Sequence, residues 1–231
     1  MDVFKSKYTA EDLENAIGAV LAPFEEGKKA EREKFWDIYQ DYGRRTSYTQ
    51  YAGGFLGVAW TDENFNPKYP MLPTEANYMF RGTSITDLTK EGVVLDFSQC
   101  SRFDYTFAFS RLKKLPFIDL SRANNTASTF NEAALVDSLH LRFSEETAIN
   151  GNMFTNTIGL VNLRIEGTIA KSIGFPQSNL LTTDAVQSVI NALKNLTGQT
   201  SQTFTVHKTV GDNMTAAQKA EITARNWTLV Y

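Results

Sequence analysis

The chain has 231 residues and a formal net charge of -3, and 42% of its residues are hydrophobic and 21% charged. This length and composition are those of a globular protein with a buried core, and they exclude the strongly basic surface that nucleic-acid binding requires. One cysteine and two histidines exclude an internal disulfide and a Cys-based zinc site and argue against a His-rich metal site, so we expect no metal and no cofactor.

Residues 1–43 are expected to form two amphipathic helices. Thr9 to Asp12 resembles a capping box, and Pro23 ends the first apolar stripe. A second helix is predicted for residues 25–42, with Gly43 as its C-terminal stop. The pattern fits helices packed on the body and fits an oligomerisation or attachment stalk. The opening residues show no signal peptide, and no apolar stretch is long enough to span a membrane.

Residues 44–78 are predicted to cap the first repeat of the segment that follows. They are rich in Tyr, Gly and Pro and contain Trp60, Phe65 and Tyr69. A repeat stack exposes apolar surface and unpaired strand edges at its end, so an irregular aromatic segment in this place has a clear physical role.

Residues 79–180 contain an internal repeat. The four segments Leu95–Ser98, Ile118–Ser121, Leu141–Ser144 and Leu163–Glu166 follow one another at spacings of 23, 23 and 22 residues. Phenylalanines recur at nearly the same period, and one aliphatic residue lies between each phenylalanine and the next strand. These positions are Phe107, Phe130 and Phe154, with Phe80 as a looser first member, and Ile85, Leu112, Leu135 and Ile158.

A fixed period with the same residue types in register predicts an α/β solenoid. We expect a leucine-rich-repeat-like stack of about four repeats with a short parallel sheet, in which the recurring phenylalanines form one buried column. The period lies within the range of roughly 20–29 residues of leucine-rich repeats. A β-sandwich with accidental spacing is the alternative.

Residues 181–231 are predicted to form an α/β cap on the C-terminal end. A helix capped by Thr183 and followed by Gly198 carries apolar residues on one face, namely Val186, Val189, Ile190 and Leu193. The stretch "TFTVHKTV" alternates as a strand, and Thr215 with Gln218 forms a capping box for a last helix. The segment from Trp227 to Tyr231 is predicted to close the fold as a strand.

The repeat pattern of residues 78–180 resembles the BspA-like type of leucine-rich repeat. The flanking stretches "KAEREKFWDIYQDYGRRTSY", "AWTDENFNPKYP", "NYMFRGTSITDL" and "LTTDAVQSVINALKNLTGQTSQTFTVHKTV" are similar to a group of prophage-encoded structural proteins of gram-positive bacteria. This resemblance implies a tail-associated or virion-surface component that is made in the bacterial cytoplasm. The asparagine ladder of other leucine-rich repeats is absent, which predicts a looser side opposite the strands.

No motif in the chain indicates an enzyme. The sequence has no nucleophile elbow, P-loop, dinucleotide fingerprint or metal-ligand spacing. Glu145 and Glu146 are adjacent on a predicted turn and diverge, and Cys100 follows a strand and is expected to be packed. A glycan hydrolase would need two positioned carboxylates, and no such pair is indicated by spacing.

Candidate binding residues lie on the outward positions of the predicted strands. If the repeats stack in register, these positions form two ladders on the concave face that solenoids present to partners. The ladders run acidic to basic, and aromatic residues beside arginine are typical of interface hot spots. The candidates are Asp96, Phe117, Asp119, His140, Arg142 and Arg164. A solvated face with incidental ion pairs is the alternative.

The sequence therefore predicts a non-enzymatic repeat protein, a phage tail or virion-surface component that mediates attachment through protein or glycan binding. The expected partners are other virion or tail proteins, or a host-surface protein or glycan. The N-terminal helices would serve assembly or a homo-oligomer and would be dispensable for folding of the repeats. The alternative function is a bacterial leucine-rich-repeat interaction module or adhesin that is not part of a virion.

Overall fold

The computed structural model describes residues 53–58, 60–63, 65, 67 and 70–231, all of which belong to one compact unit spanning residues 48–231. The helices expected in residues 1–43 lie outside the described residues, as does Tyr69 of the predicted N-terminal cap.

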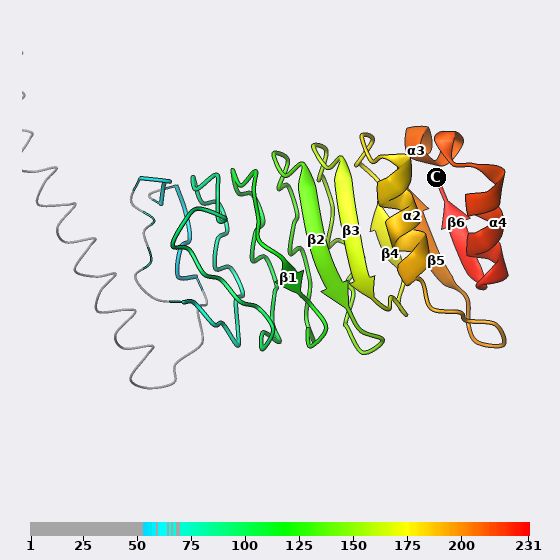
Figure 1. The fold of residues 1–231 in the computed structure, drawn as a ribbon, viewed down its shortest axis with the longest axis horizontal. Helices are drawn as coiled ribbons and strands as arrows, with labels where there is room; N and C mark the ends of the chain where they lie inside the picture. The colour runs from blue at the N-terminus through cyan, green and yellow to red at the C-terminus, as the bar shows by residue number, and fades with distance from the viewer. Residues whose placement is uncertain (1–52, 59, 64, 66, 68–69) are drawn as a thin grey trace, which may run out of the picture. The chain divides into compact units, whose positions relative to one another are not determined.

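The described unit contains two parallel sheets of three strands each, with strand orders β1-β2-β3 and β4-β5-β6 (Figure 1). Figure 1 shows the strands of both sheets in chain order, side by side, with the helices gathered at the C-terminal end. The strands are β1 (Ile118–Asp119), β2 (Ser138–Phe143), β3 (Asn162–Gly167), β4 (Ile173–Phe175), β5 (Gln202–Val206) and β6 (Trp227–Val230), and the helices are α2 (Thr183–Ala192), α3 (Lys208–Asn213) and α4 (Ala216–Ala224).

Before β1, isolated parallel bridges join successive turns of the chain in place of strands. Met71 pairs with Leu95, Glu75 with Arg102, and Arg102 in turn with Asn125. The strand expected at Leu95 is therefore a single bridge.

A column of stacked phenylalanine rings forms the core. Phe107, Phe130 and Phe154 are fully buried, and the centroid distance is 5.3 Å between each successive pair, with interplanar angles of 14° and 5°. The predicted column is therefore confirmed, because residues one repeat apart bring the same side chain to the same place. It also extends further at both ends, to Phe55, Phe80 and Phe175.

The aliphatic positions were predicted only in part. Ile85 and Leu112 are buried, but Leu135 is 44% and Ile158 51% exposed. The buried residues in those two turns are Val136 and Leu160, which lie one and two positions further along the chain. The spacing between phenylalanine and strand varies from turn to turn, so a fixed offset selects the wrong aliphatic side chain.

On the side opposite the strands, consecutive turns are joined by backbone and threonine hydrogen bonds. The amides of Tyr78 and Phe80 donate to carbonyls of the next turn, and this pattern continues through the following turns. Thr106 and Thr129 also donate their hydroxyls to carbonyls of the preceding turn, at 2.9 and 3.1 Å. These threonines satisfy buried carbonyl groups where an asparagine ladder was absent from the sequence.

The C-terminal cap follows most of its predicted helix and strand signals. The capping box of Thr215 and Gln218 is present at the start of α4, and the closing strand is β6. The cap of α2 is Thr182, one residue before the predicted position, and the helix ends at Ala192, six residues before Gly198. The strand predicted in "TFTVHKTV" ends at Val206, because the side chain of His207 accepts the Thr209 amide and starts α3.

Candidate functional site

The register of the first sheet decides which outward side chains meet. In β1 and β2, Asp119 pairs with Arg142, as the 23-residue spacing predicts. In β2 and β3, however, His140 pairs with Arg164, and Arg142 pairs with Glu166. The predicted 22-residue step, which placed Arg164 beside Arg142, is therefore wrong by two residues. A two-residue shift keeps every side chain on the same face of a strand, so the alternation of apolar residues alone does not reveal it.

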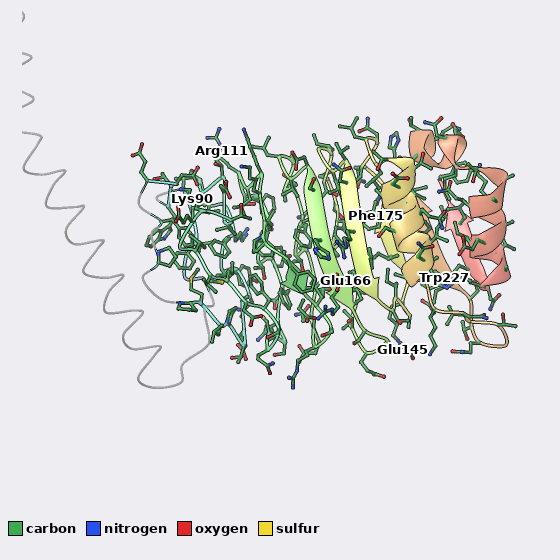
Figure 2. The ribbon with its side chains drawn as sticks, viewed as in Figure 1. Lys90, Arg111, Glu145, Glu166, Phe175 and Trp227 are labelled. Carbon is green, nitrogen blue, oxygen red and sulfur yellow. The ribbon has the colours of Figure 1, made fainter. Side chains whose placement is uncertain are left out.

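Six side chains form the strand-face cluster, two on or next to each strand of the first sheet. They are Phe117, Asp119, His140, Arg142, Arg164 and Glu166. Five of them are predicted candidates, and Glu166 was missed. Figure 2 shows Glu166 at this sheet, away from Arg111 on the upper edge.

Arg142 is the centre of the strand-face cluster. One terminal nitrogen donates to Asp119 at 3.2 Å, and the other donates to Glu166 at 2.7 Å. Its Cζ atom also lies 4.9 Å from the centroid of the Phe117 ring, which is a cation–π distance. The guanidinium is therefore held by groups from the turn before it and the turn after it.

His140 and Arg164 complete the strand-face cluster. The His140 ring lies 4.7 Å from the Phe117 ring, and its Nε2 is 2.8 Å from a carboxylate oxygen of Glu166. Arg164 donates to the same carboxylate at 3.4 Å, and its side chain is 72% exposed. Arg164 is therefore the cation of this cluster with the most freedom to contact a partner.

Asp119 is less accessible than a position on an open face should be. It is only 8% exposed, because Arg142 binds one carboxylate oxygen and the amide of Ser121 donates to the other at 2.9 Å. Its contacts hold Arg142 and the following turn, so Asp119 offers a partner little accessible surface.

Asp96 does not join the strand-face cluster in the described structure. It is exposed and accepts the amide of Ser98 at 2.8 Å, a local turn like that of Asp119. Within the described residues, no bridge or backbone hydrogen bond joins Leu95–Phe97 to β1. The position of Asp96 relative to the strand-face cluster is therefore not fixed by strand pairing.

The charges of the strand-face cluster compensate one another. Hydrogen bonds from Arg142 and then His140 lower the pKa of Glu166 from its ordinary value, and the bond to Glu166 raises the pKa of Arg142. Two carboxylates and two guanidinium groups therefore alternate in the strand-face cluster. The predicted gradient from acidic to basic is wrong, because Glu166 occupies the place assigned to Arg164.

Glu166 could have been found from the spacing of the core phenylalanines. Phe130 and Phe154 are 24 residues apart, and the same step places Arg142 opposite Glu166. The 22-residue step came from aligning Leu141 with Leu163, because each is followed two positions later by another apolar residue.

Cys100 and Glu145 lie in surroundings that do not activate them for catalysis. Cys100 is buried, and burial raises the pKa of its thiol to about 12, so it is not an activated nucleophile. Glu145 is exposed on a turn and pairs with Lys194 at 2.6 Å.

Comparisons of the chain with protein-family models, with curated proteins and with solved structures found no match. In the part of the chain that the structure describes, no helix is both long and apolar enough to cross a membrane.

Proposed function

We propose that the chain is a non-enzymatic repeat protein that binds a partner through the strand-face cluster. The proposed fold is an α/β solenoid related to leucine-rich repeats. Parallel pairing between residues about one repeat apart, in the sheets and in the isolated bridges, supports this fold, as does the phenylalanine column.

The observation that carries the proposed function is that the exposed side chains of the strand-face cluster hold one another in place. Arg142 is 45% exposed in its side chain and still bound by two carboxylates and a ring. Side chains that are already ordered lose less conformational entropy when a partner binds. The strand-face cluster therefore presents hydrogen-bond donors, acceptors and one aromatic ring in a prepared arrangement.

The chemistry of the strand-face cluster favours a polar partner without strong net charge. Its four charged groups pair among themselves, and Phe117 and His140 add ring surface beside them. A neutral glycan on a host surface fits this combination. Together with the resemblance to prophage structural proteins, it supports a tail or virion-surface component that attaches to a host.

The test is retention of the purified full chain on gram-positive cell walls, with affinity measured from the bound fraction. Changing His140 and Arg164 together to Ala should weaken retention by about 2 kcal/mol or more, which is about 30-fold. Arg142 is kept, because its loss would leave the buried Asp119 carboxylate without its cationic partner. Arg111→Ala, on an exposed residue at the upper edge in Figure 2, is the matched control.

Two results would contradict the proposal. Equal retention of the double variant and the wild type would remove the strand-face cluster as the binding surface. Release of soluble sugar from the walls by the wild type, at a rate that exceeds a heat-denatured sample, would show an enzyme in place of a binding protein.

A further inference from the structure

A second group of side chains lies outside the first sheet, on the turns that precede β1. We name it the aromatic–arginine cluster, and its members are Tyr78, Arg81, Tyr105 and Phe109. The rings of Tyr78 and Tyr105 stack at 5.2 Å with an interplanar angle of 4°. The Cζ atom of Arg81 lies 5.8, 5.6 and 5.3 Å from the ring centroids of Tyr78, Tyr105 and Phe109.

The three aromatic residues of this cluster occupy backbone positions that disfavour them. Their φ angles are 60°, 56° and 57°, in the left-handed region, where bulky residues are rare. In the turn after Tyr105, the amide of Tyr105 donates to Ala127, and the next residue, Ser128, has the same conformation with a small side chain. The left-handed conformation therefore recurs from turn to turn, also at Glu132 and Asn156, and the fold accepts a small residue where Tyr105 stands.

Arg81 has no acidic partner in the part of the chain that the structure describes. It forms no ion pair among the described residues, and its Nε atom is buried without a hydrogen-bond partner. Asp104, the acidic residue directly before Tyr105, lies 3.3 Å from Arg102. A guanidinium that lies among aromatic rings and forms no ion pair with the described residues is suited to bind an external anion through its terminal nitrogens.

The rings add to this preference for an anion. Tyr78 and Tyr105 cover one face of each other, and the edge of an aromatic ring carries positive potential. Neither phenol hydroxyl forms a hydrogen bond within the described residues. Phe109 is 41% exposed and offers apolar surface beside Arg81.

The backbone around the aromatic–arginine cluster favours a saccharide over an extended peptide. The amides of Tyr78, Phe80 and Gly82 already donate to the next turn, and those of Tyr105 and Phe109 do the same. A peptide strand would find no free donor row for pairing at these positions. A sugar ring needs only side-chain contacts, which the aromatic rings and Arg81 supply.

We propose that the aromatic–arginine cluster is a second binding site that takes an acidic saccharide. The carboxylate pairs with Arg81, the tyrosine hydroxyls donate to neighbouring oxygens, and the apolar face of the sugar ring packs on Phe109. This site is separate from the strand-face cluster and does not depend on it.

The test titrates the full chain with tetragalacturonate and with sialyllactose by calorimetry. The neutral counterparts are methyl-esterified tetragalacturonate and lactose. We expect at least one acidic sugar to bind at least 10-fold more tightly than its neutral counterpart. Arg81→Gln and Tyr105→Ser should each weaken that binding at least 10-fold, and thermal melting checks that both variants are folded. Arg111→Gln, on an exposed residue outside the cluster, and Arg164→Ala, in the strand-face cluster, should leave it unchanged.

Three outcomes would overturn this proposal. The first is that neither acidic sugar binds, and the second is that the neutral sugars bind equally well. The third is that hexaglutamate binds more tightly than both sugars with the same dependence on Arg81, which would assign the site to an acidic peptide. Because Arg164→Ala reports on the strand-face cluster, failure of either site is measured independently of the other.

Discussion

Arg142 in β2 donates to Glu166 in β3 at 2.7 Å, although the two residues are 24 positions apart in the sequence. The same guanidinium donates to Asp119, so one side chain connects three consecutive turns. The bond matters mainly because it orders the exposed face of the first sheet.

The contribution of Glu166 to stability should depend on pH. Arg142 and then His140 lower the pKa of Glu166 below its ordinary value of 4.5, and Arg164 faces the same carboxylate. A group with a lowered pKa in the folded state stabilises the fold fully above its unfolded pKa, and this stabilisation is lost as the pH falls through the folded pKa. The difference in melting temperature between the wild type and Glu166→Gln should be present at pH 7 and shrink below about pH 4.5. Glu91→Gln, on an exposed turn, is the control. A difference that grows on acidification would refute this assignment.

Truncating the phenylalanine column should destabilise the fold strongly. Phe130→Ala removes a fully buried ring that stacks on both neighbours, and the expected cost is about 3–5 kcal/mol. Leu135→Ala, at a position that the sequence placed in the core and the structure exposes, should cost less than about 1 kcal/mol. Urea unfolding measures both free energies. Equal costs would mean that Leu135 is packed in the core.

Alanine substitutions at three glycines should distinguish the cost of backbone strain from the cost of a steric clash. Gly151→Ala should be nearly neutral, because its φ is not positive and a Cβ atom would meet open space. Gly92→Ala should cost about 1–2 kcal/mol, since its φ of +83° is left-handed but the surroundings are open.

Gly167→Ala should cost more than Gly92→Ala. Its φ is +79°, and a Cβ atom would lie 2.0 Å from the carbonyl oxygen of Phe143 in the paired strand. Denaturant unfolding should show that the loss of stability increases from Gly151→Ala through Gly92→Ala to Gly167→Ala. A Gly167 variant as stable as the wild type would mean that the end of β3 is not paired as described.

Cys100 should react with thiol reagents only after unfolding. Burial raises its pKa to about 12, so at pH 8 the thiol is protonated and shielded. A disulfide reagent such as DTNB should label the native chain slowly and label the chain in guanidinium at once. Rapid labelling of the native chain would place Cys100 at an accessible surface.

The repeat made the core predictable. Phe107, Phe130 and Phe154 recur at nearly one period, and a buried ring in one turn requires a similar ring above and below it. The capping box of Thr215 and Gln218 was predictable for a different reason, because it depends on residues only three positions apart. The strand predicted across His207 failed, because the same alternation is compatible with a strand end followed by a helix cap.

The sequence by itself determined the period and the side chains of the aromatic column, because burial imposes the same residue type in each turn. It also determined the outward position of five strand-face residues, because side chains alternate between the two faces of a strand. Only the tertiary structure decided the two-residue shift that pairs Arg142 with Glu166, since both registers bury the same apolar residues. It also decided the meeting of Arg81 with Tyr78, Tyr105 and Phe109, which lie on turns of unequal length. Exposed side chains carry no periodic constraint from the core, so their neighbours follow from the lengths of the turns and the hydrogen bonds between them.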